Sequence, residues 1–546
     1  MDSPVIIAGG GPVGMTLALE LAHHNVRSIV LEQNETTTRH PKMDLTNGRS
    51  MELFRRLGIV PALRAVGVPE DHPLDVVWGT RLNGHVLKRF AYPSPKVMSI
   101  RAIAANDGRS TSEPPMRVSQ IVLEPVLKAA LDANSLIDVR FGSAFEDLTQ
   151  DAGGVTVTVR KSATGEVEKL RCGYLAGCDG GGSKVRRKLN IELEGEHAIG
   201  RAYMVHFKSS ADILHRHGLI YHFQTGLGTV ISQDGGETYT LQMMLPPGVD
   251  EKALDPADLL RQFAGEDFQF EILVSNPWSP HMVIAEEYGR GRVFLAGDAV
   301  HQVVPTGGYG MNTGIADAVD LGWKLAAAVN GWAGPQLLGS YKIERHQIAV
   351  QNRAAALRHL MVRVAIGEKI NEAEQACDLD SEEAAEKRQA LGRDIAALGN
   401  AENESWGIEH GYRYTGSPVI AVADEDGTEP AFDPLHSAPT TWPGSRLPAV
   451  FLEDGSVLAD QLGRDFSLLV ADDLDVSELV KGAAEAGVPL TLVKVPELAR
   501  SILQKKLVLV RPDQHVAWRG DDVPAHARAL FDQVAGYANA ELGIPA

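Results

Sequence analysis

The N-terminal part of the chain alternates short apolar runs with amphipathic stretches. Residues 5–8 are uniformly apolar, and a second apolar run follows at 28–31. Between them, the stretch that contains Met15, Leu17, Leu19 and Leu21 is interpreted as an amphipathic helix. Uniformly apolar runs joined by helical periodicity are typical of buried parallel strands with crossover helices, so this part predicts an α/β fold.

The pattern changes between about Arg201 and Pro277. Residues 218–223 and 239–244 alternate apolar and polar side chains, which predicts antiparallel strands with one buried face. The α/β pattern returns at Arg292. A sheet of a second kind therefore interrupts the first domain.

The C-terminal part divides into three stretches. Residues 339–398 predict long helices, and residues 424–448 are rich in Pro, Asp, Thr and Ser, as expected for a linker. Apolar runs at 466–470, 490–493 and 507–510 predict strands of a small separate α/β domain.

Composition narrows the class of protein. The chain has 546 residues and a net charge of −19, which suggests several domains and disfavours nucleic acid or anionic membranes as partners. No apolar run approaches the roughly 18 residues that span a bilayer, and a strand-like run already begins at Val5, so we expect a soluble cytoplasmic protein without a signal peptide. The three cysteines form no CxxC pair, and no metal site is expected.

A glycine-rich motif follows the first predicted strand. Gly9, Gly11 and Gly14 fit GxGxxG, and Glu32 ends the next strand. In this context the glycines allow a tight turn, close approach to a pyrophosphate and helix packing, while the helix N-terminus attracts the phosphates. The motif predicts dinucleotide binding without distinguishing FAD from NAD.

Two later motifs favour a flavin. Apolar strands end at Asp179-Gly180 and at Gly297-Asp298, and the second continues into a glycine-rich loop at 305–314 that opens a helix. Backbone N–H groups there suit the negative charge of a reduced isoalloxazine ring.

With these three motifs in this order, the chain resembles the group A flavoprotein monooxygenases, the superfamily of p-hydroxybenzoate hydroxylase and phenol hydroxylase. The resemblance implies an α/β FAD-binding Rossmann-like domain of the glutathione-reductase type, an interleaved antiparallel-sheet substrate domain and a thioredoxin-like C-terminal domain. The predicted boundaries are 1–75, 100–200 and 278–370 for the FAD-binding domain, 76–99 and 201–277 for the substrate domain, 371–440 for a helical region and linker, and 441–546 for the C-terminal domain.

The resemblance also implies a set of FAD contacts. It assigns the ADP half of FAD to the first motif and the ribitol or ribose of FAD to the Gly-Asp motif. The loop before the long helix is expected to hold the pyrimidine edge of the flavin, and the Asp-Gly motif to contact both FAD and the nicotinamide cofactor. The implied residues are Gly9, Gly11, Pro12, Val13, Gly14, Glu32, Gln33, Lys42, Arg117, Gln120, Asp179, Gly180, Gly297, Asp298, Pro305, Gly308, Gly310, Met311 and Asn312. Lys42 departs from the family, which commonly has arginine there, and Gln120 alternatively belongs to a helix-capping loop.

The implied reaction is hydroxylation of a small aromatic substrate by O2. In the family, NADPH or NADH reduces FAD, a flavin C4a-hydroperoxide forms near Pro305, and its electrophilic oxygen attacks the ring. A base that deprotonates a phenol assists this step, and Asp44 matches the position of such an aspartate. The alternative for Asp44 is a cap of the helix that begins near Asn47.

Substrate contacts are expected on the antiparallel sheet. Alternation places either Tyr221 or His222 inward, where it would orient a phenol, and Gln242 and Met244 share one strand face that could line a pocket. The alternative for Tyr221 or His222 is a residue of the sheet face whose hydroxyl or ring is satisfied within the protein, and the alternative for Met244 is core packing. His301 and Trp278 are expected to be structural.

Other readings remain open at this point. Relatives with the same extension occur in phenol and polyketide branches, so Baeyer–Villiger oxidation, epoxidation or ring cleavage of a polycyclic substrate is the second reading. A non-enzymatic prenyl-protein carrier of the same fold is the remote one. The C-terminal domain has no cysteine, which excludes dithiol chemistry and leaves a structural or dimer-contact role. The resemblance suggests a homodimer.

Overall fold

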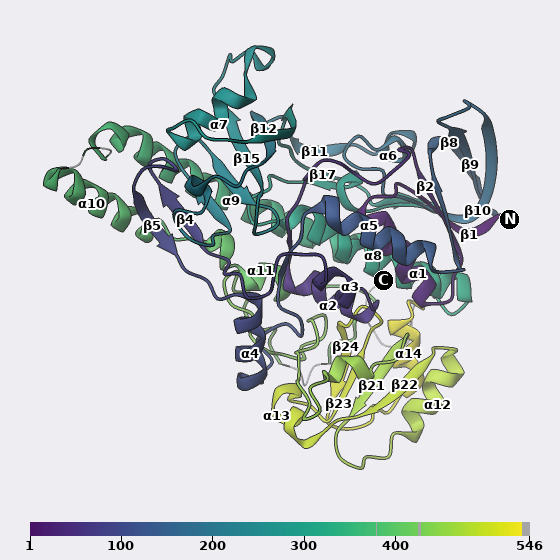
Figure 1. The fold of residues 1–546 in the computed structure, drawn as a ribbon. Helices are drawn as coiled ribbons and strands as arrows, with labels where there is room; N and C mark the ends of the chain where they lie inside the picture. Colours follow the sequence, from purple (N-terminus) through teal and green to yellow (C-terminus); the bar gives the residue numbers. More distant parts are fainter. Residues whose placement is uncertain (378, 380, 424–426, 538–546) are drawn as a thin grey trace.

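A parallel sheet forms the centre of the computed structural model, which describes residues 1–377, 379, 381–423 and 427–537 (Figure 1). β1 (Ser3–Ala8) lies between β2 (Ser28–Glu32) and β10 (Val167–Gly177), with β7 (Ile137–Phe141) beyond β2 and β19 (Val293–Leu295) beyond β10, all parallel. The helices α1 (Pro12–His23) and α8 (Tyr309–Asn330) pack against each other beside this sheet. The apolar run Val5 to Ala8 is fully buried, as the sequence predicted.

The edges of the sheet carry shorter elements. β8 (Ser143–Asp151) and β9 (Gly154–Lys161) form an antiparallel ribbon on β10, and β18 (Gly289–Arg290) pairs with β19. α5 (Gln120–Asp132) packs on α1, and α6 (Lys184–Lys188) follows β10.

The second sheet has seven strands. Their order is β16 (Glu271–Trp278), β12 (Arg201–Lys208), β15 (Thr238–Leu245), β14 (Thr229–Ser232), β13 (His222–Gln224), β4 (Val76–Gly79) and β5 (Val86–Phe90). Helix α7 (Pro256–Ala264) packs its apolar residues into the core of this sheet. The expectation of a strand over 218–223 is wrong in part, because the strand begins only at His222 and pairs in parallel with β4.

Short elements join the two sheets. β11 (Leu193–Glu196), β17 (Met282–Ala285) and β20 (His301–Gln302) form a small sheet, and β3 (Leu45–Thr46) pairs with β6 (Met116–Arg117). Helices α2 (Gly48–Arg56), α3 (Val60–Arg64) and α4 (Pro95–Ala105) follow β3 and β5.

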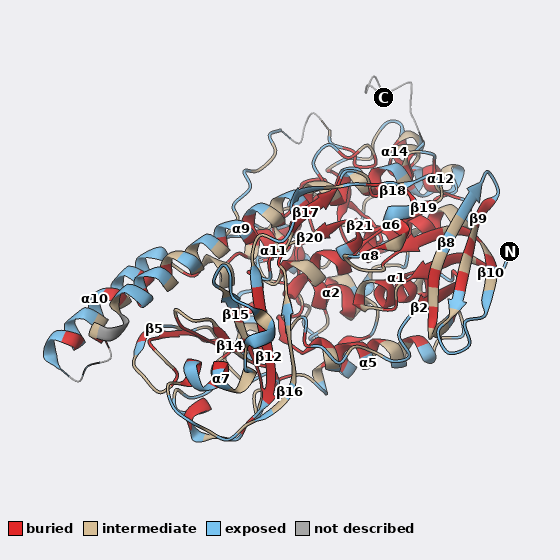
Figure 2. Ribbon diagram, turned by 90° about the horizontal axis from the view of Figure 1, so that it is seen from above, coloured by how far each residue is buried: buried red, intermediate tan, exposed pale blue. Residues whose placement is uncertain are grey.

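The long helices α9 (Leu337–Cys377) and α10 (Glu382–Leu398) project beside the second sheet as an arm (Figures 1 and 2). The turn η4 (Ala401–Asn403) and helix α11 (Trp406–His410) bring the chain back towards the first sheet. None of the helices in the described part of the chain is long and apolar enough to cross a membrane.

The C-terminal part contains a mixed sheet in the order β22-β21-β23-β24. β21 (Phe466–Val470) and β22 (Leu490–Lys494) are parallel and linked by α12 (Ser477–Ala486), while β23 (Leu507–Val510), after α13 (Arg500–Leu503), and β24 (Val516–Gly520) are antiparallel and lead to α14 (Ala527–Val534). This α/β unit is the expected C-terminal fold.

The C-terminal unit packs directly against α8 and the segment that follows it. Phe466 of β21 meets Trp323 of α8 and Trp332 edge to face, with ring centroids 6.1 Å apart in both pairs. Residues 441–448 of the predicted linker are buried. The domain boundaries remain a prediction. Residues 378, 380, 424–426 and 538–546 of the predicted domains lie outside the described part of the chain.

Candidate active site

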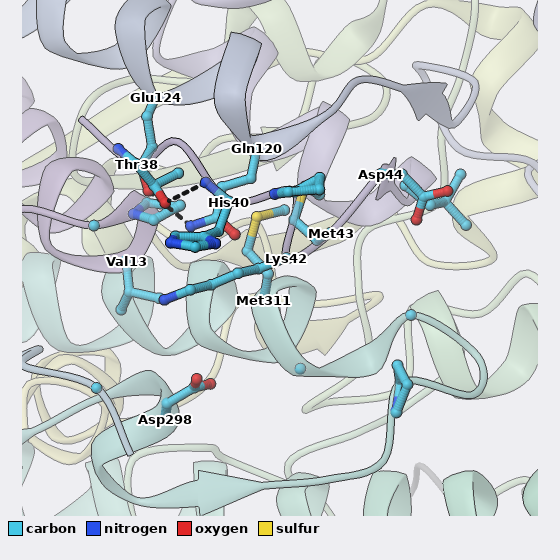
Figure 3. Close-up of a pocket in the computed structure, with 18 of the residues that line it drawn as sticks. Val13, Thr38, His40, Lys42, Met43, Asp44, Gln120, Glu124, Asp298 and Met311 are labelled. Carbon is cyan, nitrogen blue, oxygen red and sulfur yellow. Dashed lines mark hydrogen bonds between the residues drawn. The ribbon is translucent and has the colours of Figure 1, made fainter. Parts of the chain in front are cut away.

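One cavity of about 1420 Å³ runs from the carboxyl ends of β1 and β10 to the face of the seven-stranded sheet. In Figure 3, Lys42 extends across it towards Val13 and Asp298, and Asp44 lies away from them on the other side. The predicted residues that line it are Gly9, Gly11, Pro12, Val13, Glu32, Gln33, Lys42, Asp44, Gln120, Asp179, Gly180, Tyr221, His222, Gln242, Asp298, Pro305, Gly308, Gly310 and Met311. The predicted residues absent from its wall are Gly14, Arg117, Met244, Gly297 and Asn312.

The first glycine motif forms an anion cradle at the N-terminus of α1. Gly11 is the N-cap, no side chain caps the helix, and a Cβ on Gly11 would meet no atom within 4 Å. Gly9 has a φ of +110°, and a Cβ there would lie 2.2 Å from the Cys178 carbonyl oxygen. Gly14 packs helix on strand, because its Cβ would lie 2.0 Å from the Gly9 oxygen. The free N–H groups of α1 therefore face open cavity.

The loop before α8 forms a second cradle. Gly308 is the N-cap with a φ of +65°, no side chain caps α8, and a Cβ on Gly310 would meet nothing within 4 Å. The side chain of Asn312 does not face the cavity. It donates to the backbone oxygens of Leu45 (3.0 Å) and Gly308 (2.7 Å), which ties the loop to β3.

Two acidic residues of the sequence motifs have different environments. The Asp179 carboxylate accepts hydrogen bonds from Ser183 Oγ and from the Lys184 and Val185 N–H groups at the start of α6, so it organises the turn. Asp298 projects into the cavity, and burial raises the pKa of its carboxyl group. Beside it, the Gly297 N–H donates to buried Asp317, which explains why Gly297 is not in the wall.

Asp44 lies where the loop from β2 enters β3. It does not cap α2, because the Asn47 side chain accepts from Ser50 N at 2.9 Å and performs that role itself. One carboxylate oxygen of Asp44, Oδ2, is buried without a partner. Burial raises the pKa of Asp44, against the neighbouring Tyr221 side chain and the charges of Arg117 and Arg363. A carboxyl group of this kind can accept a proton from a ligand.

Tyr221 and His222 both face the cavity, whereas alternation predicted only one of them. Tyr221 precedes the strand, so the period of two does not apply, and the two rings stack 3.8 Å apart between centroids. His222 is 7% exposed, and neither ring nitrogen has a partner. Burial and the charges of Arg363 and Arg117 hold its pKa well below the usual range, so the imidazole is neutral.

The two residues of β15 that were predicted to contact substrate lie in different environments. Gln242 lines the cavity and accepts a hydrogen bond from Trp278 Nε1 at 3.1 Å, so Trp278 does more than pack. Met244 is 49% exposed and lies outside the cavity, which contradicts its assignment to the substrate pocket.

An ion pair that the sequence reasoning missed lines the same cavity. Arg363 of α9 donates to Glu402 from Nε (2.6 Å) and NH2 (2.8 Å), and Glu402 also accepts the Gly307 N–H at 3.0 Å. The two residues are 39 positions apart in a helical region. No local sequence pattern there distinguishes them from the charged residues of a solvent-exposed helix face.

Arg117 lies behind the wall and not on it. It is 3% exposed, and its guanidinium carbon sits 4.7 Å from the centroid of the Tyr221 ring. The side chain donates to the Ser232 carbonyl oxygen. The predicted contact between Arg117 and FAD therefore does not fit its position.

One cavity combines two helix N-termini without side-chain caps, the acidic residue Glu32 at the end of β2 and a polar sheet face. Together these features define a dinucleotide-binding oxidoreductase of the flavin type. The cradles fit FAD, since added Cβ atoms at Gly11 and Gly310 would enter only the space a ligand needs. Comparison with known families agrees. Residues 2–356 match the family described as FAD binding domain, and residues 440–538 match aromatic-ring hydroxylase, C-terminal. The chain belongs to this family of FAD-dependent aromatic hydroxylases and monooxygenases.

Individual relatives cover nearly the whole chain. The FAD-dependent monooxygenase apdD of Emericella nidulans is 38% identical over 99% of this chain and 91% of its own. Phenol 2-monooxygenase of a Pseudomonas species is 29% identical over 98% and 93%. The solved structure of RebC with bound 7-carboxy-K252c matches with a TM-score of 0.88 and 33% identity, over 98% of this chain and all of that one.

Proposed function

We propose that the protein hydroxylates a phenolic aromatic substrate with O2, using electrons that NADPH or NADH delivers to bound FAD. The observation that carries this proposal is the Asp44 carboxyl group, which faces the cavity beside Tyr221 with a buried, unpartnered oxygen. Bound FAD supplies hydride acceptance and oxygen activation. The protein supplies the base, the orientation of the ring and the exclusion of water.

Asp44 and its neighbours prepare the substrate. The Asp44 carboxylate accepts the phenol proton, which makes the ring more nucleophilic, and Tyr221 lies beside it in the cavity wall. Neutral His222 can donate one hydrogen bond and accept another, which suits a hydroxyl or carbonyl group of the substrate. Pro305 lies in the wall beside the second cradle.

The sheet face indicates a substrate with more than one ring. Two rows of paired residues line the cavity across neighbouring strands. One row is His222, Ile231 and Thr240, and the other is Thr229, Gln242, Met204 and Asn276. From β13 to β16 there are four strand spacings, or roughly 19 Å. The cavity also exceeds the roughly 300–1,000 Å³ that one ligand of drug size occupies, which leaves room for FAD and a multi-ring substrate.

The test is product analysis with the FAD-loaded protein. NADPH and NADH oxidation is followed with phenol, catechol, 1-naphthol and hydroxyanthraquinones, and products are weighed by mass spectrometry. We expect faster oxidation and a product one oxygen atom heavier with the multi-ring phenols. Asp44→Asn is the matched control, since it keeps the shape and loses the base.

Two other results would change the proposal. If no phenol stimulates oxidation while a polycyclic ketone yields a ring-expanded lactone, Baeyer–Villiger oxidation replaces hydroxylation. If the purified protein binds no FAD, the proposal of an enzyme fails altogether.

A further inference from the structure

Arg117 is a buried cation that the reaction described above does not use. Its strand holds the segment that carries Asp44: Val118 N donates to the Asp44 oxygen (2.9 Å), and Gln120 N to the Met43 oxygen (3.0 Å). Arg117 itself pairs with Leu45 in the β3–β6 ladder. The backbones of Asp44 and Arg117 are thus fixed to each other.

The Arg117 side chain is fixed as firmly as its backbone. It stacks under the Tyr221 ring, donates to Ser232 and leaves Nε buried without a partner. Burial by itself lowers the pKa of Arg117, and Tyr221 and Asp44 are the first groups that oppose this. Tyr221 and Asp44 are thus the main groups that stabilise the Arg117 cation.

We propose that Arg117 is a positioning residue for the base: it holds the Tyr221 ring against Asp44, and its charge favours the ionised carboxylate. This inference rests on the proposed function, because it assigns to Asp44 the role of accepting the phenol proton. A cation beneath an aromatic ring attracts the ring face, and across the ring its field still reaches the carboxylate.

Other charged groups also act on Asp44, Tyr221 and Arg117. Arg363 from α9 also acts on Asp44, Glu402 acts on Tyr221, and Asp234 acts on Arg117. Arg363 is neutralised by its ion pair with Glu402, so Arg117 is the cation whose removal changes Asp44 most. Because the Arg117 charge acts on Asp44 from the far side of the Tyr221 ring, its loss should raise the pKa of Asp44 by about one to two units.

The experiment measures proton transfer without turnover. The FAD-loaded protein binds juglone, a two-ring phenol whose phenolate absorbs at longer wavelength, and the pH midpoint of its ionisation is recorded. We expect Arg117→Met to raise, by about one pH unit or more, the pH below which Asp44 is already protonated and bound juglone therefore stays neutral, and Arg117→Lys to raise it much less. In an Asp44→Asn background the same substitution should have no effect.

Folding and FAD binding are checked by melting temperature and flavin fluorescence, and Arg117→Gln replaces the methionine variant if that one does not fold. An unchanged midpoint in the uncharged variant, with wild-type protein still ionising juglone, overturns the role of Arg117 alone. Loss of FAD binding at an unchanged midpoint also overturns it and restores the predicted FAD contact. Juglone that stays neutral in wild type overturns the base assignment and this role together.

Discussion

Replacing Arg511 by methionine tests whether a buried ion network joins the C-terminal unit to the FAD-binding fold. Arg511 is buried in the turn after β23. It donates to Glu344 of α9 at 2.6 and 2.9 Å, to Asp320 of α8 at 2.8 Å and to Asp513 at 2.8 Å. Lys324 binds the carboxylates of Asp320 and Glu344 as well, so it is the second cation of the cluster.

The size of the expected stability loss follows from the charges that remain when Arg511 is removed. Without Arg511, three buried carboxylates face the single cation Lys324. Breaking a buried ion pair from one side costs about 3–5 kcal/mol, because the remaining charges stay desolvated. The folded-to-unfolded ratio should therefore fall on the order of a hundred- to several-thousand-fold. Methionine fills the space, so a cavity adds little.

The loss should depend on pH. Burial alone would raise the pKa of Glu344, but the charges of Arg511 and Lys324 hold it below its ordinary value. A carboxyl group with a lowered folded pKa stabilises the protein above its unfolded pKa of about 4.3, and this contribution fades as pH falls towards the folded pKa. The Arg511→Met variant lacks much of this contribution. The difference in unfolding free energy between the variant and wild type is therefore largest near neutral pH and shrinks in acid.

The assay is urea unfolding of the FAD-loaded protein at pH 7.5 and pH 5, followed by circular dichroism and tryptophan fluorescence. Two probes are needed because a chain of several parts need not unfold in one step. Arg261→Met, which breaks exposed pairs with Asp258 and Asp267, is the matched control and should leave the midpoint unchanged. A difference below about 1 kcal/mol for Arg511→Met at pH 7.5 would refute the reasoning, since it would mean that the cluster is internally compensated.

Three further predictions concern the cavity. Asp44→Asn should slow hydroxylation by about 10²- to 10⁴-fold. Wild type should lose activity as pH falls through the raised pKa of Asp44, and the variant should lack this pH dependence. Stopped-flow measurement of product formation tests this, and a variant that still loses activity in acid would contradict it. Gly11→Val should fold but lose FAD, measured by flavin retention, whereas Gly339→Ala, also in open space, should keep it. Gln242→Ala should raise the substrate KM several-fold and Met244→Ala should not; equal effects would contradict the cavity boundary.

The nucleotide cradles could be predicted from the sequence because their determinants are local. Gly9 and Gly308 need positive φ values, and Gly11 needs open space, so the residue type itself reports the backbone conformation. Asp44 was also placed correctly in the cavity. The competing interpretation of Asp44 as a helix cap failed for a local reason as well, since Asn47 stands at the cap.

The substrate side could not be predicted in the same way. Periodicity assigned Tyr221 to a strand that begins one residue later, and it grouped Met244 with Gln242 although the cavity ends between them. Arg117 and Arg363 act on Asp44 from β6 and α9, a relation that no spacing in the chain encodes. These positions follow from how the two sheets and the helical arm meet.

The same long-range contacts give the cysteine-free C-terminal unit a function in the site. Arg511 holds Glu344, and the next residue, Arg345, binds Asp317 at 2.8 Å and the Thr313 carbonyl oxygen at 3.2 Å. Asp317 in turn accepts the Gly297 N–H. A displacement of the C-terminal unit would therefore reach the N-terminal part of α8 and the Gly-Asp turn, which we propose to contact FAD, through buried charges that are costly to leave unpaired. We infer that the unit contributes position instead of redox chemistry, and the Arg511→Met variant should accordingly weaken FAD retention as well as stability.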